Sequence, residues 1–193
     1  MLQRPLTPTE TTYFSKYLSL LIKWNSSHRM IGPSHPNEIA EELILDSLLF
    51  LQVVPKDIES VVDIGSGAGL PGIPIKIVRP SIRMLLVESR QRRASFLSAA
   101  VRDLSLTETQ VLSERVLTAP TELRSTFDCA VARCAGSPGS TMRLGAEFVR
   151  KGGIVVLAGS PNQDGPTEAA ETSRRVIIRS GSGRSRSFLV KDM

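Results

Sequence analysis

The chain of 193 residues has only two cysteines and two histidines, and this scarcity excludes several kinds of site. Cys129 and Cys134 form no metal-binding pattern, and so low a cysteine count favours a reducing cytosol. His28 and His35 have no partners at the spacing of metal ligands. We therefore expect a protein without a metal site.

Long apolar runs and a signal peptide are also lacking. No run approaches the roughly 20 apolar residues that a membrane-spanning helix needs. The first ten residues are polar and contain proline, which is unlike a secretory signal. The apolar content of 41% and the charged content of 22% are ordinary for a globular protein. We expect a cytoplasmic protein that does not enter a membrane.

An excess of basic over acidic residues is lacking in the first third of the chain and is confined to the rest. Residues 1–60 carry five Lys or Arg against seven Asp or Glu, whereas the whole chain has a net charge of +5. Arginine suits bidentate contact with phosphate, so the basic excess suggests a polyanionic partner, with a solvated basic surface as the alternative. The main arginines of this excess are Arg90, Arg92, Arg93, Arg102, Arg174, Arg175, Arg179, Arg184 and Arg186.

The most informative stretch is a glycine-rich turn that follows a short β-branched run. The run includes Asp63, and Gly65 and Gly67 then begin a dinucleotide-binding pattern, but Leu70 occupies the place of its third glycine. The observed spacing of Gly65, Gly67 and Gly69 is instead typical of S-adenosylmethionine (AdoMet) methyltransferases. The alternative interpretation is that these glycines only form a tight turn.

A second acidic residue, Glu88, ends the next apolar run, 25 residues after Asp63. A carboxylate at this place can accept hydrogen bonds from both ribose hydroxyls of a nucleoside. An ordinary charge at a strand end is the alternative. The polar loop 113–117 follows the third expected strand, so we expect it to border an adenine ring.

Strands and helices alternate between residues 61 and 158, which predicts a parallel, doubly wound α/β sheet. A terminal β-hairpin would add an antiparallel strand, as in the Rossmann-like class I AdoMet methyltransferases. We expect helices at 9–26 and 37–51 to form an N-terminal appendage (1–55) packed on a methyltransferase domain (56–193). The expected strands lie at 61–64, 83–88, 109–112, 127–132, 153–158, 174–178 and 187–190, with further helices at 71–78, 90–103 and 140–150.

The acceptor can be narrowed by motifs that the chain lacks. Methylation of exocyclic amines commonly uses an Asn/Asp-Pro-Pro-aromatic motif after the fourth strand, where residues 131–135 read Val-Ala-Arg-Cys-Ala. Cytosine C5 methylation needs a cysteine nucleophile, usually beside proline or threonine, and Cys134 has neither neighbour. A ring nitrogen with its own lone pair, such as guanine N7, needs no general base. The absence of an evident base is compatible with N7 chemistry.

The run from Asp63 to Pro80 resembles the GidB family, also called RsmG, the bacterial 16S ribosomal RNA guanine-N7 methyltransferases. The Leu-Pro-Gly-Ile-Pro that begins at Leu70 is more specific than the glycine loop before it. Supporting matches lie at Trp24-Asn25, Asp46-Ser47-Leu48, Glu88-Ser89, Arg92-Arg93, Phe96-Leu97, Arg115-Val116 and Arg133. The resemblance implies AdoMet as cofactor and the small ribosomal subunit or its RNA as partner.

The resemblance implies cofactor contacts at Gly65, Leu70, Val116, Leu117 and Arg133, to which the sequence pattern adds Asp63, Gly67, Gly69 and Glu88. Arg133 would place the base or the cofactor in catalysis. RNA phosphates would lie against Arg92, Arg93, Arg184 and Arg186.

The family's usual pattern is absent at Arg29, Leu43, Cys134 and Ala158. Two rival hypotheses therefore remain open: a methyltransferase with another acceptor, and a non-catalytic module that binds AdoMet or RNA. Nothing in the sequence calls for a dimer, and we expect a monomer.

Overall fold

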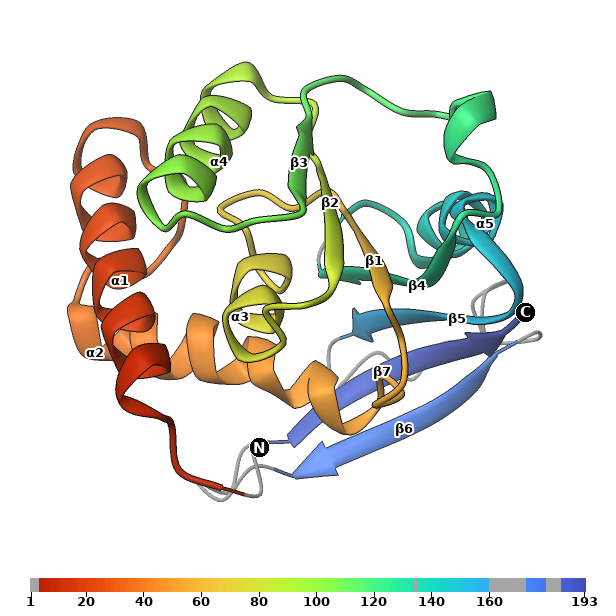
Figure 1. Cartoon of the computed structure of the whole chain (residues 1–193), viewed down its shortest axis with the longest axis horizontal. Coiled ribbons are helices and arrows are strands. Elements are labelled where there is room, and N and C mark those ends of the chain that lie inside the picture. Colours follow the sequence, from red (N-terminus) through yellow and green to blue (C-terminus); the bar gives the residue numbers. More distant parts are fainter. Residues whose placement is uncertain (1–3, 134, 160–172, 180–184) are drawn as a thin grey trace.

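A seven-stranded sheet in the order β3-β2-β1-β4-β5-β7-β6 forms the centre of the molecule. The structure, a computed structural model, describes residues 4–133, 135–159, 173–179 and 185–193. Strands β1 to β5 run parallel, and β7 and β6 are antiparallel additions at one edge. Figure 1 shows α1, α3 and α4 together on one side of the sheet, with α5 on the other. The predicted doubly wound sheet with a terminal hairpin is confirmed.

Each expected strand is present in the structure. The strands are β1 (Ser60–Ile64), β2 (Arg83–Val87), β3 (Thr109–Leu112), β4 (Phe127–Arg133), β5 (Val149–Gly159), β6 (Arg174–Arg179) and β7 (Ser185–Asp192). All five residues of β1 are buried, as expected for a strand that is covered by helices on both faces. The glycines at 181 and 183, predicted to turn the hairpin, lie outside the described residues.

Helices α1 and α5 begin at side-chain caps, whereas α4 has none among the described residues. In α1, the Thr7 hydroxyl accepts from the Glu10 N–H, and the Glu10 carboxylate accepts from the Thr7 N–H, which is a reciprocal capping box. Arg4 pairs with Glu10, and this hydrogen bond lowers the pKa of Glu10 to about 2. The helices are α1 (Pro8–His28), α2 (Pro36–Glu38), α3 (Gly72–Val78), α4 (Gln91–Asp103) and α5 (Pro138–Phe148).

The prediction of a single helix at 37–51 is wrong. The chain instead forms α2, a π-helical segment η1 (Ile39–Leu45) and a 3₁₀ segment η2 (Leu48–Gln52); a 3₁₀ turn η3 (Thr121–Leu123) occurs later. His35, not Asn37, is the N-cap residue of α2. Three consecutive side chains from Leu48 to Phe50 are buried, which a one-sided α-helix cannot achieve, and the chain winds more tightly there.

The N-terminal helices share one core with the sheet. Tyr17 and Leu21 of α1 are fully buried in the same apolar cluster as Ile73 of α3 and Phe96 of α4. A second cluster, around Phe148, joins α5 to the opposite face of the sheet. No helix among the described residues is long and apolar enough to cross a membrane.

The order of the strands fixes where a ligand can bind. β1 lies between β2 and β4, so the direction in which strands are added reverses at this point of the sheet. In open α/β sheets such a reversal leaves a crevice beyond the carboxyl ends of the two central strands. The crevice here lies between the loop after β1 and the segment after β4.

Gly145 allows α5 to approach the sheet closely, and replacing it tests this packing. A Cβ at Gly145 would lie 2.8 Å from Val155 Cγ1 and 3.3 Å from Ala130 Cβ. The destabilisation from overpacking exceeds the stabilisation from the higher helix propensity of alanine. Gly145→Ala should therefore lower the free energy of unfolding by about 1–2 kcal/mol. Urea unfolding measures the change.

Gly32→Ala is the matched control, because a Cβ there meets nothing within 4 Å. It should change the unfolding free energy by less than about 0.5 kcal/mol. Equal stability of the two variants would contradict the close packing of α5.

Candidate active site

A cavity of about 480 Å³ lies at the carboxyl ends of the central strands. Residues from the end of β1, the end of β2, the loop after β3 and the start of α5 surround it. Its volume is within the range of small-molecule and cofactor sites. The lining residues are Ile64, Gly65, Val87, Ser89, Arg90, Glu114, Arg115, Val116, Leu117, Ala135, Gly136, Ser140, Thr141 and Leu144.

The glycine loop lies at the wall of this cavity, and its backbone needs glycine. Gly65, Gly67 and Gly69 all have positive φ, at 68°, 59° and 85°. A Cβ at Gly65 would lie only 2.7 Å from the Cβ of Ala135, so the loop after β1 nearly touches the segment after β4. Of the three glycines, Gly65 lines the cavity directly.

Glu88, which the sequence predicts as the ribose ligand, connects β2 to the glycine loop. Its Oε2 accepts from the Gly67 N–H at 2.9 Å, and its Oε1 accepts from the Arg90 N–H at 2.7 Å. The residue is only 5% exposed and lies beside the lining residues Val87 and Ser89. Each carboxylate oxygen can still accept another hydrogen bond.

Asp63 is fully buried below the glycine loop. Its Oδ2 accepts from the Gly72 N–H at 2.9 Å, which ties the end of β1 to the start of α3. Its Oδ1 is buried and has no partner among the described residues. Burial raises the pKa of Asp63 to about 7. The hydrogen bond from Gly72 lowers this pKa but does not cancel the effect of burial.

Gly69 and Leu70 are buried behind the loop and do not line the cavity. A Cβ at Gly69 would lie 2.4 Å from Ile73 Cδ1, so this glycine serves the packing of α3. The Tyr17 hydroxyl donates to the Ala68 carbonyl at 2.6 Å, which fixes the back of the loop to α1.

Val116 and Leu117 line the cavity from the loop after β3. Leu117 is 76% exposed, the highest value among the exposed large apolar side chains of the described residues. An apolar side chain at the mouth of a cavity can cover a flat ring. Sequence reasoning placed this loop correctly beside the crevice.

Arg133 does not line the cavity, because its side chain extends from the end of β4 toward η1. A single nitrogen, Nη1, donates to Leu43 O at 3.3 Å, to Asp46 Oδ2 at 3.1 Å and to Ser47 Oγ at 3.5 Å. Nε and Nη2 have no partner within the described part of the chain.

The arginines predicted to bind RNA lie in different surroundings. Arg92 is exposed on α4, whereas Arg93 is half-buried and donates to the Met30 carbonyl at 3.2 Å. Arg186 pairs with Asp46 at 2.8 Å. Arg184 lies outside the described residues.

Sequence reasoning missed the contribution of α5 to the cavity. Ser140, Thr141 and Leu144 come from its first turns, and the Thr141 hydroxyl donates to the Ala135 carbonyl at 3.2 Å. Ser137 caps this helix. The Ser137-Pro138 pair, which follows the fourth strand after a short loop, was the available signal, because it marks the start of a helix.

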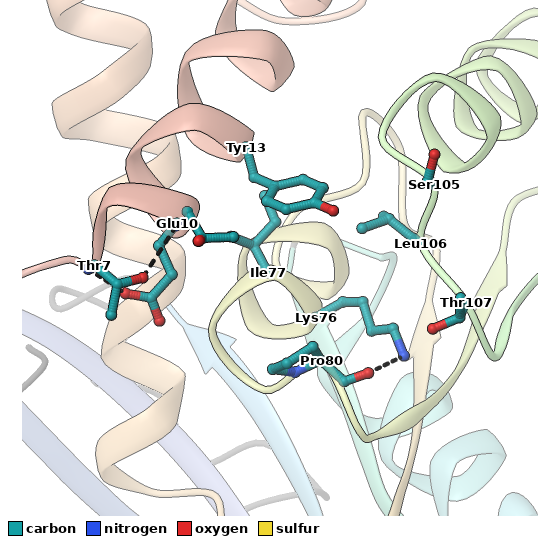
Figure 2. A pocket seen from close by; sticks show the side chains of 10 residues that line it. Thr7, Glu10, Tyr13, Lys76, Ile77, Pro80, Ser105, Leu106 and Thr107 are labelled. Carbon is teal, nitrogen blue, oxygen red and sulfur yellow. Dashed lines mark hydrogen bonds between the residues drawn. The ribbon is translucent and has the colours of Figure 1, made fainter.

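A second hollow, of about 450 Å³, lies between α1, α3 and the connection from α4 to β3 (Figure 2). It is at the opposite end of the sheet, since its residues Pro80 and Thr107 precede β2 and β3. The buried Lys76 ammonium donates to the carbonyls of Pro80 and Ile82 at 2.8 and 2.5 Å. No residue predicted for the cofactor or RNA site lines this hollow.

Neither a reactive thiol nor a metal-binding cluster occurs in the described part of the chain. Cys129 is fully buried in β4, and burial raises the pKa of its thiol, which makes it a poor nucleophile. Cys134 lies outside the described residues. No group of three or more His, Cys, Asp or Glu among the described side chains could hold a metal ion.

Comparison with known sequences identifies one family. The family model described as rRNA small subunit methyltransferase G (GidB) matches residues 10–186. A protein of that name from Desulfitobacterium hafniense is 33% identical over 168 residues, which cover 86% of this chain and 68% of the relative. Another, from Sorangium cellulosum, is 35% identical over 178 residues, which cover 91% and 71%.

Several solved methyltransferases have a similar fold. A SAM-dependent methyltransferase from Aquifex aeolicus superposes with a TM-score of 0.59 at 15% identity, over 79% of this chain and 92% of that one. The putative methyltransferase yhhF from Escherichia coli gives 0.57 at 13% identity, over 77% and 83%. At these identities the likeness concerns the fold, which is the predicted class I sheet.

The buried Asp63 generates a prediction about pH and stability. Because its pKa in the folded protein is raised from 3.8 to about 7, its stabilising contribution is complete below pH 4 and is lost as the pH rises toward 7. Asp63→Asn stays neutral throughout. One pKa unit corresponds to about 1.4 kcal/mol, so the variant should gain on the order of a few kcal/mol relative to wild type between pH 4 and pH 7.

Urea unfolding of both proteins at several pH values from 4 to 8 measures this difference. A difference that stays constant with pH would mean that Asp63 keeps an ordinary pKa in the folded protein.

Proposed function

The chain belongs to the rRNA small subunit methyltransferase G family, and from this premise we propose that it methylates guanine N7 in 16S ribosomal RNA with AdoMet as methyl donor. One structural observation carries the proposal beyond the family name. A cavity of cofactor size opens at the point where the strand order reverses, and the glycine loop forms part of its wall.

The residues around the cavity fit the adenosine part of AdoMet. Val116 and Leu117 offer apolar cover for the adenine on one side, and Leu144 of α5 offers it on the other. The remaining acceptor capacity of Glu88 suits the two ribose hydroxyls. Gly65 would let the ligand approach the backbone without meeting a side chain.

The amino-acid end of AdoMet needs an acceptor for its ammonium group and a cation for its carboxylate. Asp63 Oδ1 is a buried acceptor without a partner among the described residues, and it would serve the ammonium directly or through water. The two unengaged donors of Arg133 would serve the carboxylate. Gly67, Gly69 and Leu70 would then shape the loop between these two groups.

The sulfonium of AdoMet supplies an electrophilic methyl group. What remains for the protein is to align the acceptor in line with that methyl and to exclude water. Guanine N7 brings its own lone pair and loses no proton, so no general base is required. The cavity agrees with this demand: Glu114 is the one carboxylate among its described lining residues, and it is exposed.

We assign the approach of the RNA to the arginines at the mouth of the cavity. Arg90 and Arg115 line it, and Arg92 is exposed in the first turn of α4. Their guanidinium groups suit phosphate oxygens. Arg93 and Arg184 remain proposed phosphate ligands on the sequence alone, whereas the guanidinium of Arg186 is engaged with Asp46.

We further propose that residues 1–55 form an appendage to a catalytic domain of residues 56–193, and that the protein acts as a monomer in the cytoplasm. The contact of Tyr17 with Ala68 supports the first point, because it links α1 to the back of the glycine loop. A small-subunit RNA as substrate supports the cytoplasmic location, since bacterial ribosomes are cytoplasmic.

Methyl transfer tests the proposed function directly. The protein should transfer labelled methyl groups from AdoMet to 16S RNA or small subunits from a strain that lacks the modification. Digestion and mass spectrometry should give one equivalent of N7-methylguanosine. Labelling of other acceptors only, or AdoMet binding without any turnover, would favour one of the two rival hypotheses.

Gly65→Ala tests the place of the cofactor. The substitution strains a backbone at φ 68° and directs a methyl group at Ala135, so it narrows the cavity. AdoMet affinity, measured by calorimetry, should fall at least about tenfold, which is 1.4 kcal/mol.

Gly152→Ala is the matched control. Its φ of 81° imposes a similar backbone strain, but its nearest contact is the end of the Arg150 side chain, remote from the cavity. AdoMet affinity should stay within about twofold of wild type. An equal loss in both variants would show that strain, not the narrowed cavity, weakens binding.

A further inference from the structure

Asp46 receives two arginines from distant parts of the chain. It directly follows η1, and Arg133 reaches it from the end of β4 while Arg186 reaches it from β7. The exposed fractions of the side chains are 12% for Asp46, 13% for Arg133 and 26% for Arg186. Solvent therefore screens this cluster only partly, and its charges interact strongly.

The two arginines do not share the carboxylate equally. Arg186 binds it through two nitrogens, with Nε 2.9 Å from Oδ1 and Nη2 2.8 Å from Oδ2. Arg133 reaches only Oδ2, through Nη1 at 3.1 Å. A bidentate pair is the stronger arrangement, so Asp46 mainly compensates Arg186.

One positive charge therefore remains uncompensated in the cluster, and the geometry locates it on Arg133. Anchoring through Nη1 fixes the orientation of that guanidinium, while its Nε and Nη2 have no partner among the described residues. A mostly buried cation with two oriented donor nitrogens suits a carboxylate.

We propose that Arg186 is a positioning residue for the cofactor site: it saturates Asp46, so that Asp46 anchors Arg133 without neutralising it. The charge of Arg133 then remains available for the carboxylate at the amino-acid end of AdoMet. This inference rests on the proposed function, because it assumes that AdoMet is the ligand. It also gives the terminal hairpin a role in cofactor binding, since Arg186 belongs to β7.

Removing Arg186 should leave both carboxylate oxygens of Asp46 free to pair with Arg133. In Arg186→Met, Asp46 has one cationic partner left, and a bidentate pair with Arg133 would occupy the donors that the ligand needs. Arg186→Lys keeps a positive charge beside Asp46, so this variant should retain most of the affinity for AdoMet. Neither substitution changes a residue that lines the cavity.

Two ligands separate this effect from a general loss of structure. S-adenosylhomocysteine carries the amino-acid end, and 5′-methylthioadenosine lacks it. Calorimetry should show that Arg186→Met weakens S-adenosylhomocysteine about tenfold, as expected for a coupled charge network, and leaves 5′-methylthioadenosine within about twofold of wild type. Arg186→Lys should bind both ligands within about threefold of wild type.

The other outcomes overturn the proposal in distinguishable ways. Unchanged affinity for both ligands together with a raised KM for RNA would make Arg186 a phosphate contact. An equal loss for both ligands, with a lowered melting temperature, would make it a structural residue only. If the wild-type protein binds neither S-adenosylhomocysteine nor AdoMet, the proposed function itself fails; if the wild type binds and the variants differ only in RNA methylation, only the role of Arg186 fails.

Discussion

The conformation of the glycine loop is the constraint on which the site depends, and two acidic side chains hold it. Asp63 accepts the N–H of Gly72 behind the loop, and Glu88 accepts the N–H of Gly67 in front of it. Both acidic residues are buried; Asp63 belongs to β1 and Glu88 directly follows β2. The loop therefore takes its position from the sheet, and its close approach to Ala135 sets one wall of the cavity.

Much of the fold follows from the sequence because its signals are local. The β-branched runs and the glycine and proline residues between them predict the seven strands, and alternation with helices predicts the parallel order of the first five. The segment 37–51 does not follow, because burial of three successive side chains overrides the helical period there. The site was predicted in part: Gly65, Val116 and Leu117 line the cavity, while the contribution of α5 depends on how β4 and β1 approach in space.

The role of Asp46 could not be read from sequence for a similar reason. Its partners lie 87 and 140 residues away, and only the folded sheet brings the ends of β4 and β7 to η1. Leu43 stands where the family usually has a histidine, yet its backbone carbonyl accepts from Arg133 whatever side chain it carries. The departure at this position therefore leaves the anchoring of Arg133 intact. Substrate recognition is where such differences in side chain would act.

The central claim is that one ligand extends from the cavity beside α5, across the glycine loop, to Arg133. A crystal structure of the protein with S-adenosylhomocysteine tests it most directly. We predict the adenine between Leu117 and Leu144, the ribose hydroxyls on Glu88, and the carboxylate on Nε and Nη2 of Arg133, with Arg186 still paired to Asp46. A ligand whose carboxylate lies away from Arg133, or one bound in the hollow beside Lys76, would contradict the claim.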